Sequence, residues 1–141
     1  MLFDDNRNQV PFIDELRIIR AIVDELQVNT PHFDFKLVLT GLKIVGKQHV
    51  DKMLRHVIEG NCTEDKRLAE LIAGFDMVNE EDYTSEISVF AEEILTTKQM
   101  VDINNSHDMP CFFHCGETHN RNGQNIHDAI LLGTKRIGHG F

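Results

Sequence analysis

Residues 35–45 read FKLVLTGLKIV, an apolar run rich in branched side chains. Its apolar residues are nearly continuous, whereas a strand with one face in water alternates apolar and polar side chains. Continuous runs of this kind are typical of parallel strands that are covered on both faces. The run therefore predicts a buried strand of a parallel sheet, with Gly41 as a point at which the strand can be interrupted.

The rest of the chain alternates helical patterns with short apolar runs. Three further runs are short enough to be strands: LIAGFDMV at 71–78, CFF at 111–113 and RIGHGF at 136–141. Four segments space their apolar residues as amphipathic helices do: 12–26, 50–58, 87–95 and 126–130. We expect Gly60 and Asn61 to end the second helix. In the last helix, Asn125 is a good N-cap and Gly133 is placed at the end.

One helix thus separates each predicted strand from the next, which predicts a parallel α/β sheet with right-handed connections. A single domain is predicted over 1–141, with a helical lead-in at 1–30 and four strand and helix units at 31–141. An open doubly wound sheet and part of a closed (β/α)₈ barrel both fit, and periodicity does not choose between them. In both, functional groups gather at the carboxyl ends of the strands.

Composition narrows the classes of partner. The 141 residues are 41% hydrophobic and 26% charged, as in a globular domain, with a formal net charge of −9. The sequence has no basic stripe to release counterions, so nucleic acid and anionic membranes are not expected partners. A small neutral or cationic ligand suits it better. No run approaches the roughly 20 apolar residues of a membrane span.

Signals of cellular compartment are weak. The start, MLFDDNRNQV, lacks the basic and apolar regions of a secretory signal, so the product is either intracellular or begins upstream. Cys62, Cys111 and Cys115 predict no disulfide framework and are interpreted as buried or solvated thiols. Sequons at Asn61 and Asn104 would permit glycosylation in a secretory context, although about one is expected by chance.

The main chemical pattern is FFHCGETH at 112–119, at the end of the third predicted strand. Residues three apart in a strand point to opposite faces, so His114 and Glu117 can serve one site only if the chain bends between them. Gly116 permits that bend. A histidine beside a carboxylate suits a hydrolytic metal site, in which imidazole binds zinc and the acid moves protons.

A second histidine ends the fourth predicted strand. His139 lies between Gly138 and Gly140, and glycines on both sides let backbone and imidazole approach a ligand closely. One helical crossover separates His139 from His114, so parallel pairing predicts that they meet at neighbouring strand ends. Asp76, in the second strand, is either a further site residue or a buried carboxylate that caps a helix.

Other polar residues have ordinary interpretations. A lone strand-end histidine is more often a hydrogen-bonding residue than a ligand, so pattern alone does not favour a catalytic His114. The acidic run at 80–82 is interpreted as a solvated loop. Histidines without partners in the pattern are interpreted as surface, loop or helix-exterior residues: His32, His49, His56, His107, His119 and His127.

Three separated stretches together resemble the adenosine deaminase family. FFHCGET followed by DAILLGTKRIGHGF is similar to the family as a whole, and LIAGFDMVNEED followed by MPCFFHCGET resembles its secreted branch, the adenosine-deaminase-related growth factors. The similarity covers roughly residues 35–141, in the same order and spacing. It implies a (β/α)₈ TIM barrel of the metal-dependent hydrolase type, of which this chain would hold about half, as strands three to six.

The resemblance also implies the chemistry, which is zinc-dependent hydrolytic deamination of adenosine and deoxyadenosine in purine nucleoside metabolism. It implies that His114 is a zinc ligand, that Glu117 protonates the purine ring nitrogen and that His139 orients the attacking water. Asn79, Gly116 and Glu117 would contact the substrate. The implied partner is a purine nucleoside, and the full-length protein would be secreted, with a homodimer left open.

Several positions depart from the family pattern. The family carries a His-x-His pair at its first strand and an Asp at its eighth, and this sequence contains neither. The one zinc would therefore take most ligands from outside this chain, which alone is expected to be inactive. Asp76 would support His114. Asn79 stands where relatives have a glycine, and Cys115 where they have an alanine.

Two alternatives stay open. A non-catalytic adenosine-deaminase-like protein would bind nucleosides or a receptor, and the missing zinc ligands and Asn79 favour it. A deaminase of a related purine nucleotide would need basic residues for a 5′-phosphate, which a longer sequence would show.

Overall fold

The computed structural model describes residues 2–105, 109–118 and 123–140. His107 and His119, interpreted above as surface or loop residues, lie outside the described residues, as does residue 141. None of the described helices has the length and apolar character needed to cross a membrane. The elements, with η for a 3₁₀ helix, are α1 (Phe12–Asn29), β1 (Leu37–Leu42), η1 (Lys43–Val45), α2 (Lys47–Asn61), α3 (Lys66–Ala69), β2 (Ile72–Val78), η2 (Glu81–Tyr83), η3 (Ile87–Phe90), α4 (Ala91–Asn105), β3 (His114–Cys115), α5 (Asn125–Leu131) and β4 (Gly138–His139).

The predicted alternation of helices and strands is confirmed. The amphipathic patterns form α1, α2, η3 with α4, and α5, and the apolar runs at 35–45, 71–78 and 136–141 contain β1, β2 and β4. The third strand was predicted at 111–113 but lies just after that run, because β3 is His114–Cys115 and Cys111 makes only single bridges in the described ranges. β4, with 2 residues, is shorter than its run. The short helix α3 was not predicted, because four residues are too few to show helical periodicity.

The strand predicted at 35–45 ends earlier than expected. β1 gives way to η1, which turns the chain into Gly46 with φ of 93°. The interruption predicted at Gly41 is wrong, because Gly41 pairs with Met77 inside β1. Its missing side chain serves packing instead, since a Cβ there would lie 3.1 Å from Cζ of Phe75.

Every strand pair in the described ranges is parallel, as predicted. β1 pairs with β2, and β3 pairs with β4. Cys111 links the two pairs through single parallel bridges to Phe75 in β2 and to Thr134 before β4. Strands that follow one another in sequence are therefore neighbours in space, and their carboxyl ends share one edge.

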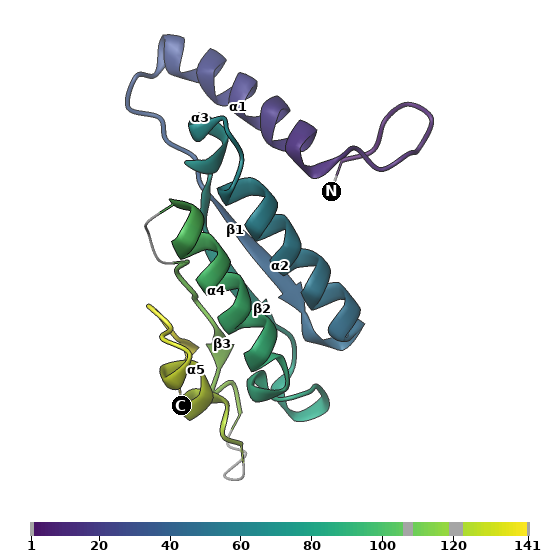
Figure 1. Cartoon of the computed structure of the whole chain (residues 1–141), viewed down its shortest axis with the longest axis vertical. Coiled ribbons are helices and arrows are strands. Elements are labelled where there is room, and N and C mark those ends of the chain that lie inside the picture. Colours follow the sequence, from purple (N-terminus) through teal and green to yellow (C-terminus); the bar gives the residue numbers. More distant parts are fainter. Residues whose placement is uncertain (1, 106–108, 119–122, 141) are drawn as a thin grey trace.

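Helices cover one side of this arrangement. Figure 1 shows α2 and α4 side by side, with α2 against β1, while α1 reaches away from the strands. A smaller core holds α1 against α3 through Leu16, Leu68 and Leu71. The main core lies between the helices and the strands, and its fully buried side chains include Val50, Val57, Phe75, Phe90, Ile94 and Phe113.

The expectation that the first strand is covered on both faces is wrong for the described residues. Val38 and Leu42 are 42% and 37% exposed, because α2 covers only the opposite face, on which Leu39 and Gly41 lie. In β2, by contrast, the consecutive residues Phe75, Asp76 and Met77 are all buried.

β2 and the segment before β3 approach closely at Gly74. Phe75 N–H donates to the Pro110 carbonyl, and Phe112 N–H donates to the Phe75 carbonyl, both at 2.9 Å. Gly74 has φ of 155°, and a Cβ on it would lie 2.3 Å from the Pro110 oxygen. A side chain at position 74 would therefore collide with backbone, so these strands can pair only around glycine.

The helix ends test three local predictions. Gly133 follows α5 with φ of 73°, as predicted. Asn125 is the first residue of α5 and not its N-cap, because its side chain is engaged elsewhere. α2 ends at Asn61, as predicted, but Gly60 lies inside the helix, where a Cβ would lie 3.0 Å from Cγ1 of Ile72.

Candidate active site

The predicted site residues lie near the carboxyl ends of β2, β3 and β4. Asp76 is in β2, His114 begins β3 and His139 ends β4. In the parallel pair, His114 is opposite Gly138 and Cys115 is opposite His139. The prediction that the two histidines meet is confirmed, with ring centroids 5.7 Å apart.

His114 is held by Asp76 from the neighbouring strand. The His114 N–H donates to Asp76 Oδ1 at 3.2 Å, and the His114 ring Nδ1 lies 2.7 Å from Asp76 Oδ2. The ring contact has ion-pair distance without the in-line geometry of a hydrogen bond. Because the Asp76 side chain is only 8% exposed, a buried carboxylate orients the imidazole and leaves Nε2 for a ligand. In the described part of the chain, these contacts of Asp76 are to His114 and not to a helix end.

Gly116 makes the predicted bend between His114 and Glu117. Its φ is 67°, in the region that favours glycine. The bend brings Oε1 of Glu117 to 3.7 Å from Nε2 of His139. Glu117, His114 and His139 therefore share one edge, with the two imidazoles on adjacent strands.

Gly138 makes room for the His114 ring. A Cβ on Gly138 would lie 2.6 Å from Cδ2 of His114, so any side chain there would displace the imidazole. His139 has φ of 73°, which is uncommon for a residue with a side chain and often marks a functional position. This backbone leaves the His139 side chain 46% exposed, so a ligand can reach it.

Asn79 combines a glycine-like backbone with an anchored side chain. Its φ is 114°, in the region that favours glycine and that asparagine tolerates better than most residues. Its Oδ1 accepts a long hydrogen bond from the Ile44 N–H at 3.4 Å. The Asn79 side chain is thus tied to η1.

The interpretation of residues 80–82 as a solvated loop is wrong for Glu81, which is hydrogen-bonded to the turn after β3. Its Oε1 accepts from the Gly116 N–H at 3.0 Å, and its Oε2 accepts from the Glu117 N–H at 2.9 Å. Asn125 Nδ2 also donates to Oε1, at 2.8 Å. Glu81 therefore belongs to the site, although no sequence motif marked it.

Lys43 is a second residue that sequence reasoning missed. It is 3% exposed, and its Nζ has no hydrogen-bond partner among the described residues. Burial lowers the pKa of the Lys43 ammonium, while the negative charges of Glu81 and Glu117 oppose that change. Its sequence signal is a lysine inside an apolar run, which alone is compatible with a side chain that reaches solvent.

The geometry fits His114 as one zinc ligand. Metal-binding histidines usually place the second ring nitrogen on a carboxylate, as His114 does with Asp76. A catalytic zinc takes about three protein ligands. Within 2–105, 109–118 and 123–140, no group of three or more His, Cys, Asp and Glu residues is arranged to hold a metal ion. The described residues therefore offer one ligand and its support.

Cys115 is expected to be an unreactive thiol. Burial raises the pKa of the Cys115 thiol to about 11, and the Glu81 charge adds to the effect. The thiolate fraction near neutral pH is then about 100-fold below that of an ordinary cysteine. We predict that a neutral alkylating reagent modifies the buried Cys115 more slowly than the half-buried Cys62, as measured by mass spectrometry of the two peptides, although burial also raises the pKa of the Cys62 thiol.

Unfolding in urea supplies the control for Cys115, because both cysteines should then react at similar rates.

The raised pKa of Cys115 also has a consequence for stability. Between pH 9 and about 11 the unfolded chain releases this proton while the folded chain keeps it, so stability falls as pH rises. Rapid modification of Cys115 in the native protein would contradict the burial that both expectations rest on.

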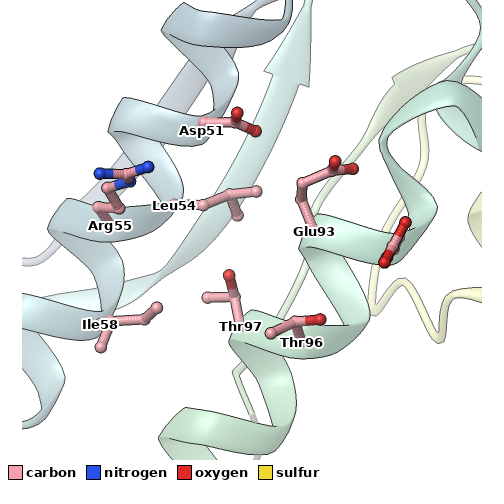
Figure 2. Close-up of a pocket in the computed structure, with 8 residues that line it drawn as sticks. Asp51, Leu54, Arg55, Ile58, Glu93, Thr96 and Thr97 are labelled. Carbon is pink, nitrogen blue, oxygen red and sulfur yellow. The ribbon is translucent and has the colours of Figure 1, made fainter.

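A surface groove of about 290 Å³ lies away from these residues. Figure 2 shows it between α2 and α4, with Asp51 on one helix and Glu93 on the other. Glu93 is already paired with Lys47. The groove belongs to the helical layer and not to the strand ends, so we do not assign the chemistry to it.

The chain is similar in sequence to adenosine deaminases of insects and vertebrates. No protein-family model matches the chain. An adenosine deaminase of Lutzomyia longipalpis is 28% identical over 143 residues, which is 99% of this chain and 26% of that protein. An adenosine deaminase of Aedes albopictus is 34% identical over 107 residues, or 72% of this chain and 19% of that protein. Human adenosine deaminase 2 is 33% identical over 107 residues, or 72% and 20%. The chain thus spans about a fifth to a quarter of the length of these curated relatives. With its matching motifs and strand-end site, the chain belongs to the adenosine deaminase family, on the growth factor branch that includes adenosine deaminase 2.

Proposed function

We propose that the full-length protein containing this chain is a zinc-dependent adenosine deaminase. It would replace the 6-amino group of adenosine or deoxyadenosine by the oxygen of water, giving inosine or deoxyinosine and ammonia. The observation that carries the proposal is the convergence of His114, Glu117 and His139 at one sheet edge, in a chain whose relatives are named adenosine deaminases. Two imidazoles and a carboxyl group within reach of one another suit proton transfer to and from a purine.

Each side chain has surroundings that suit a role. His114 would bind zinc through Nε2, with Asp76 holding its ring from the other side. The Glu117 carboxyl group would donate a proton to the purine ring nitrogen, and His139 would orient the attacking water. Asn79 would hold the base with its backbone N–H. A bound zinc would supply water with a pKa of about 7, which makes hydroxide available at neutral pH.

The same proposal places the chain in a (β/α)₈ barrel. A barrel of about 250 residues needs parallel strands that are neighbours in chain order, and this chain would supply strands three to six. The exposed side chains of Val38 and Leu42 would then face the barrel interior. We further propose that the full-length protein is secreted, that its partner is a purine nucleoside, and that it can form a homodimer.

The direct test is an adenosine-to-inosine absorbance assay on the full-length protein, with and without a metal chelator. We expect turnover that the chelator abolishes and that added zinc restores. Preference for adenosine monophosphate over adenosine would favour the nucleotide alternative. Absence of turnover with every purine nucleoside would remove the proposed activity.

Replacing His114 tests the proposed metal ligand without reference to activity. The His114→Ala variant of the full-length protein is expected to lose most of the one zinc per chain, because the remaining ligands bind too weakly. Asp76→Asn should retain zinc but with about 10- to 100-fold lower affinity. Elemental analysis after dialysis measures both.

His127→Ala is the matched control for this experiment. His127 is an exposed histidine on α5. It lies between His114 and His139 in the sequence but has no role in the proposed site. It should keep its full zinc content. Retention of one zinc per chain by His114→Ala would contradict the assignment.

A second candidate function is nucleoside binding without turnover. It is favoured by Asn79, whose side chain stands where the resemblance to the family predicts glycine and accepts a hydrogen bond from the Ile44 N–H. Calorimetric titration with adenosine that shows binding, in a zinc-loaded protein that releases no ammonia, would support this candidate over the enzyme.

A further inference from the structure

One carboxylate holds the turn that carries Glu117. The two oxygens of Glu81 accept from two successive backbone N–H groups, of Gly116 and Glu117, at 3.0 and 2.9 Å. Successive N–H groups point to a common acceptor here because Gly116 has φ of 67°. This partly buried turn would otherwise leave two donors without partners, at a cost that folded proteins avoid.

The carboxylate of Glu81 is itself held in place from α5. Asn125 donates to Glu81 Oε1 at 2.8 Å, and its own Oδ1 accepts from the buried Ile87 N–H at 2.7 Å. Asn125 is 2% exposed, so this amide has little freedom to turn away. The turn at Gly116 and Glu117, η2, η3 and α5 are thereby connected through Glu81 and Asn125.

Electrostatics keep Glu81 in the form that can accept these bonds. Burial alone would raise the pKa of Glu81, but the hydrogen bonds from Gly116, Asn125 and Glu117 and the charge of Lys43 outweigh it and hold the pKa below its ordinary value. Lys43 is buried without a hydrogen-bond partner of its own among the described residues. Its charge therefore acts on the acids of this edge in a poorly solvated setting.

We propose that Glu81 is a positioning residue, which fixes the backbone of Gly116 and Glu117 and so sets where the Glu117 carboxyl group meets the substrate. The inference rests on the proposed function of Glu117. We call the two hydrogen bonds from the Gly116 and Glu117 N–H groups to Glu81 the clamp. Asp82 reinforces the clamp, because its Oδ1 accepts from Thr118 Oγ1 at 2.9 Å. Misplacement of a reacting group by about 1 Å costs about 100-fold in rate, so such a clamp has a measurable effect.

The test compares Glu81→Gln with Glu80→Gln in the full-length protein. Glutamine has the size of glutamate, but its NH₂ group would face one of the two backbone N–H donors, so at least one bond is lost. We expect amide hydrogen exchange at Gly116 and Glu117 to become at least about 10-fold faster, and kcat for adenosine to fall about 100-fold with KM little changed. Glu80 is exposed, and its substitution should change neither.

The outcomes separate this inference from the proposed function. Unchanged exchange at Gly116 and Glu117 in Glu81→Gln overturns the clamp whatever the activity. Faster exchange with unchanged kcat per folded molecule shows a merely structural role and overturns the positioning role. If the wild-type protein turns over no purine nucleoside, the proposed function and the positioning role fall, while exchange still decides the clamp. Should Glu81→Gln fail to fold, the same two measurements are made on Glu81→Asp, which keeps the charge on a side chain one carbon shorter. Faster exchange with a lower kcat then supports the positioning role, and unchanged exchange overturns it.

Discussion

The Glu117→Gln variant of the full-length protein is expected to lose adenosine turnover by about 10²- to 10⁴-fold while it keeps its zinc. Glutamine matches glutamate in size and can still lie beside His139, which is 3.7 Å away in the native chain. It cannot, however, donate and recover the proton that the proposed reaction needs. Because Glu117 is not among the proposed zinc ligands, the metal content should equal that of the wild type.

The measurement is kcat and zinc content on the same preparation of Glu117→Gln. Glu25→Gln is the matched control, since Glu25 is an exposed glutamate on α1, far along the chain from the site residues. Unchanged turnover in Glu117→Gln would remove the proton-transfer role. Loss of zinc together with turnover would instead make Glu117 a metal ligand or a support for one.

The alternation of elements could be predicted because burial patterns are local. The stripes of α1 and α2 and the apolar runs of β1 and β2 reflect which side each element turns to the core, and a short window shows that. The extent of β3 and β4 could not be predicted. Their pairing depends on contacts of Cys111 with Phe75 and Thr134, which are distant in sequence.

The candidate site divides in the same way. Glu117 and His139 were found because each lies beside a glycine that shapes the local backbone, and His114 was found because it ends an apolar run two positions before Gly116. Glu81 and Lys43 were missed because a glutamate in an acidic run and a lysine in an apolar run look alike in sequence whether buried or solvated. The hydrogen-bond partners of Glu81 lie 35, 36 and 44 positions away.

Asn125 shows how a distant partner overrides a local rule. Asparagine before an apolar stripe favours an N-cap. In the structure its side chain bonds Glu81 and Ile87, so the helix begins one residue earlier than the capping rule predicts. The residue that local reasoning assigned to a helix end thus supports the proposed catalytic turn.

Replacing Gly74 is expected to have the largest effect on the fold. In Gly74→Ala the new Cβ would lie 2.3 Å from the Pro110 oxygen and 2.7 Å from Cε2 of Phe112, and the first of these is backbone that no rotamer change can move away. The hydrogen bond from the Phe75 N–H to Pro110 must then lengthen or break, which separates β2 from the segment leading to His114. Strain and overpacking each cost about 1–3 kcal/mol, so we expect a loss of roughly 3 kcal/mol or more in the free energy of unfolding.

Gly46→Ala separates the two contributions in the Gly74 experiment. Gly46 has φ of 93°, but a Cβ there would meet no atom within 4 Å, so the substitution introduces backbone strain without a collision. We expect it to cost about 1 kcal/mol, measured with Gly74→Ala by urea denaturation of the same protein. Equal effects of the two substitutions would show that β2 can move away from Pro110 at little cost, and that the close pairing around Gly74 does not hold the His114 strand in place.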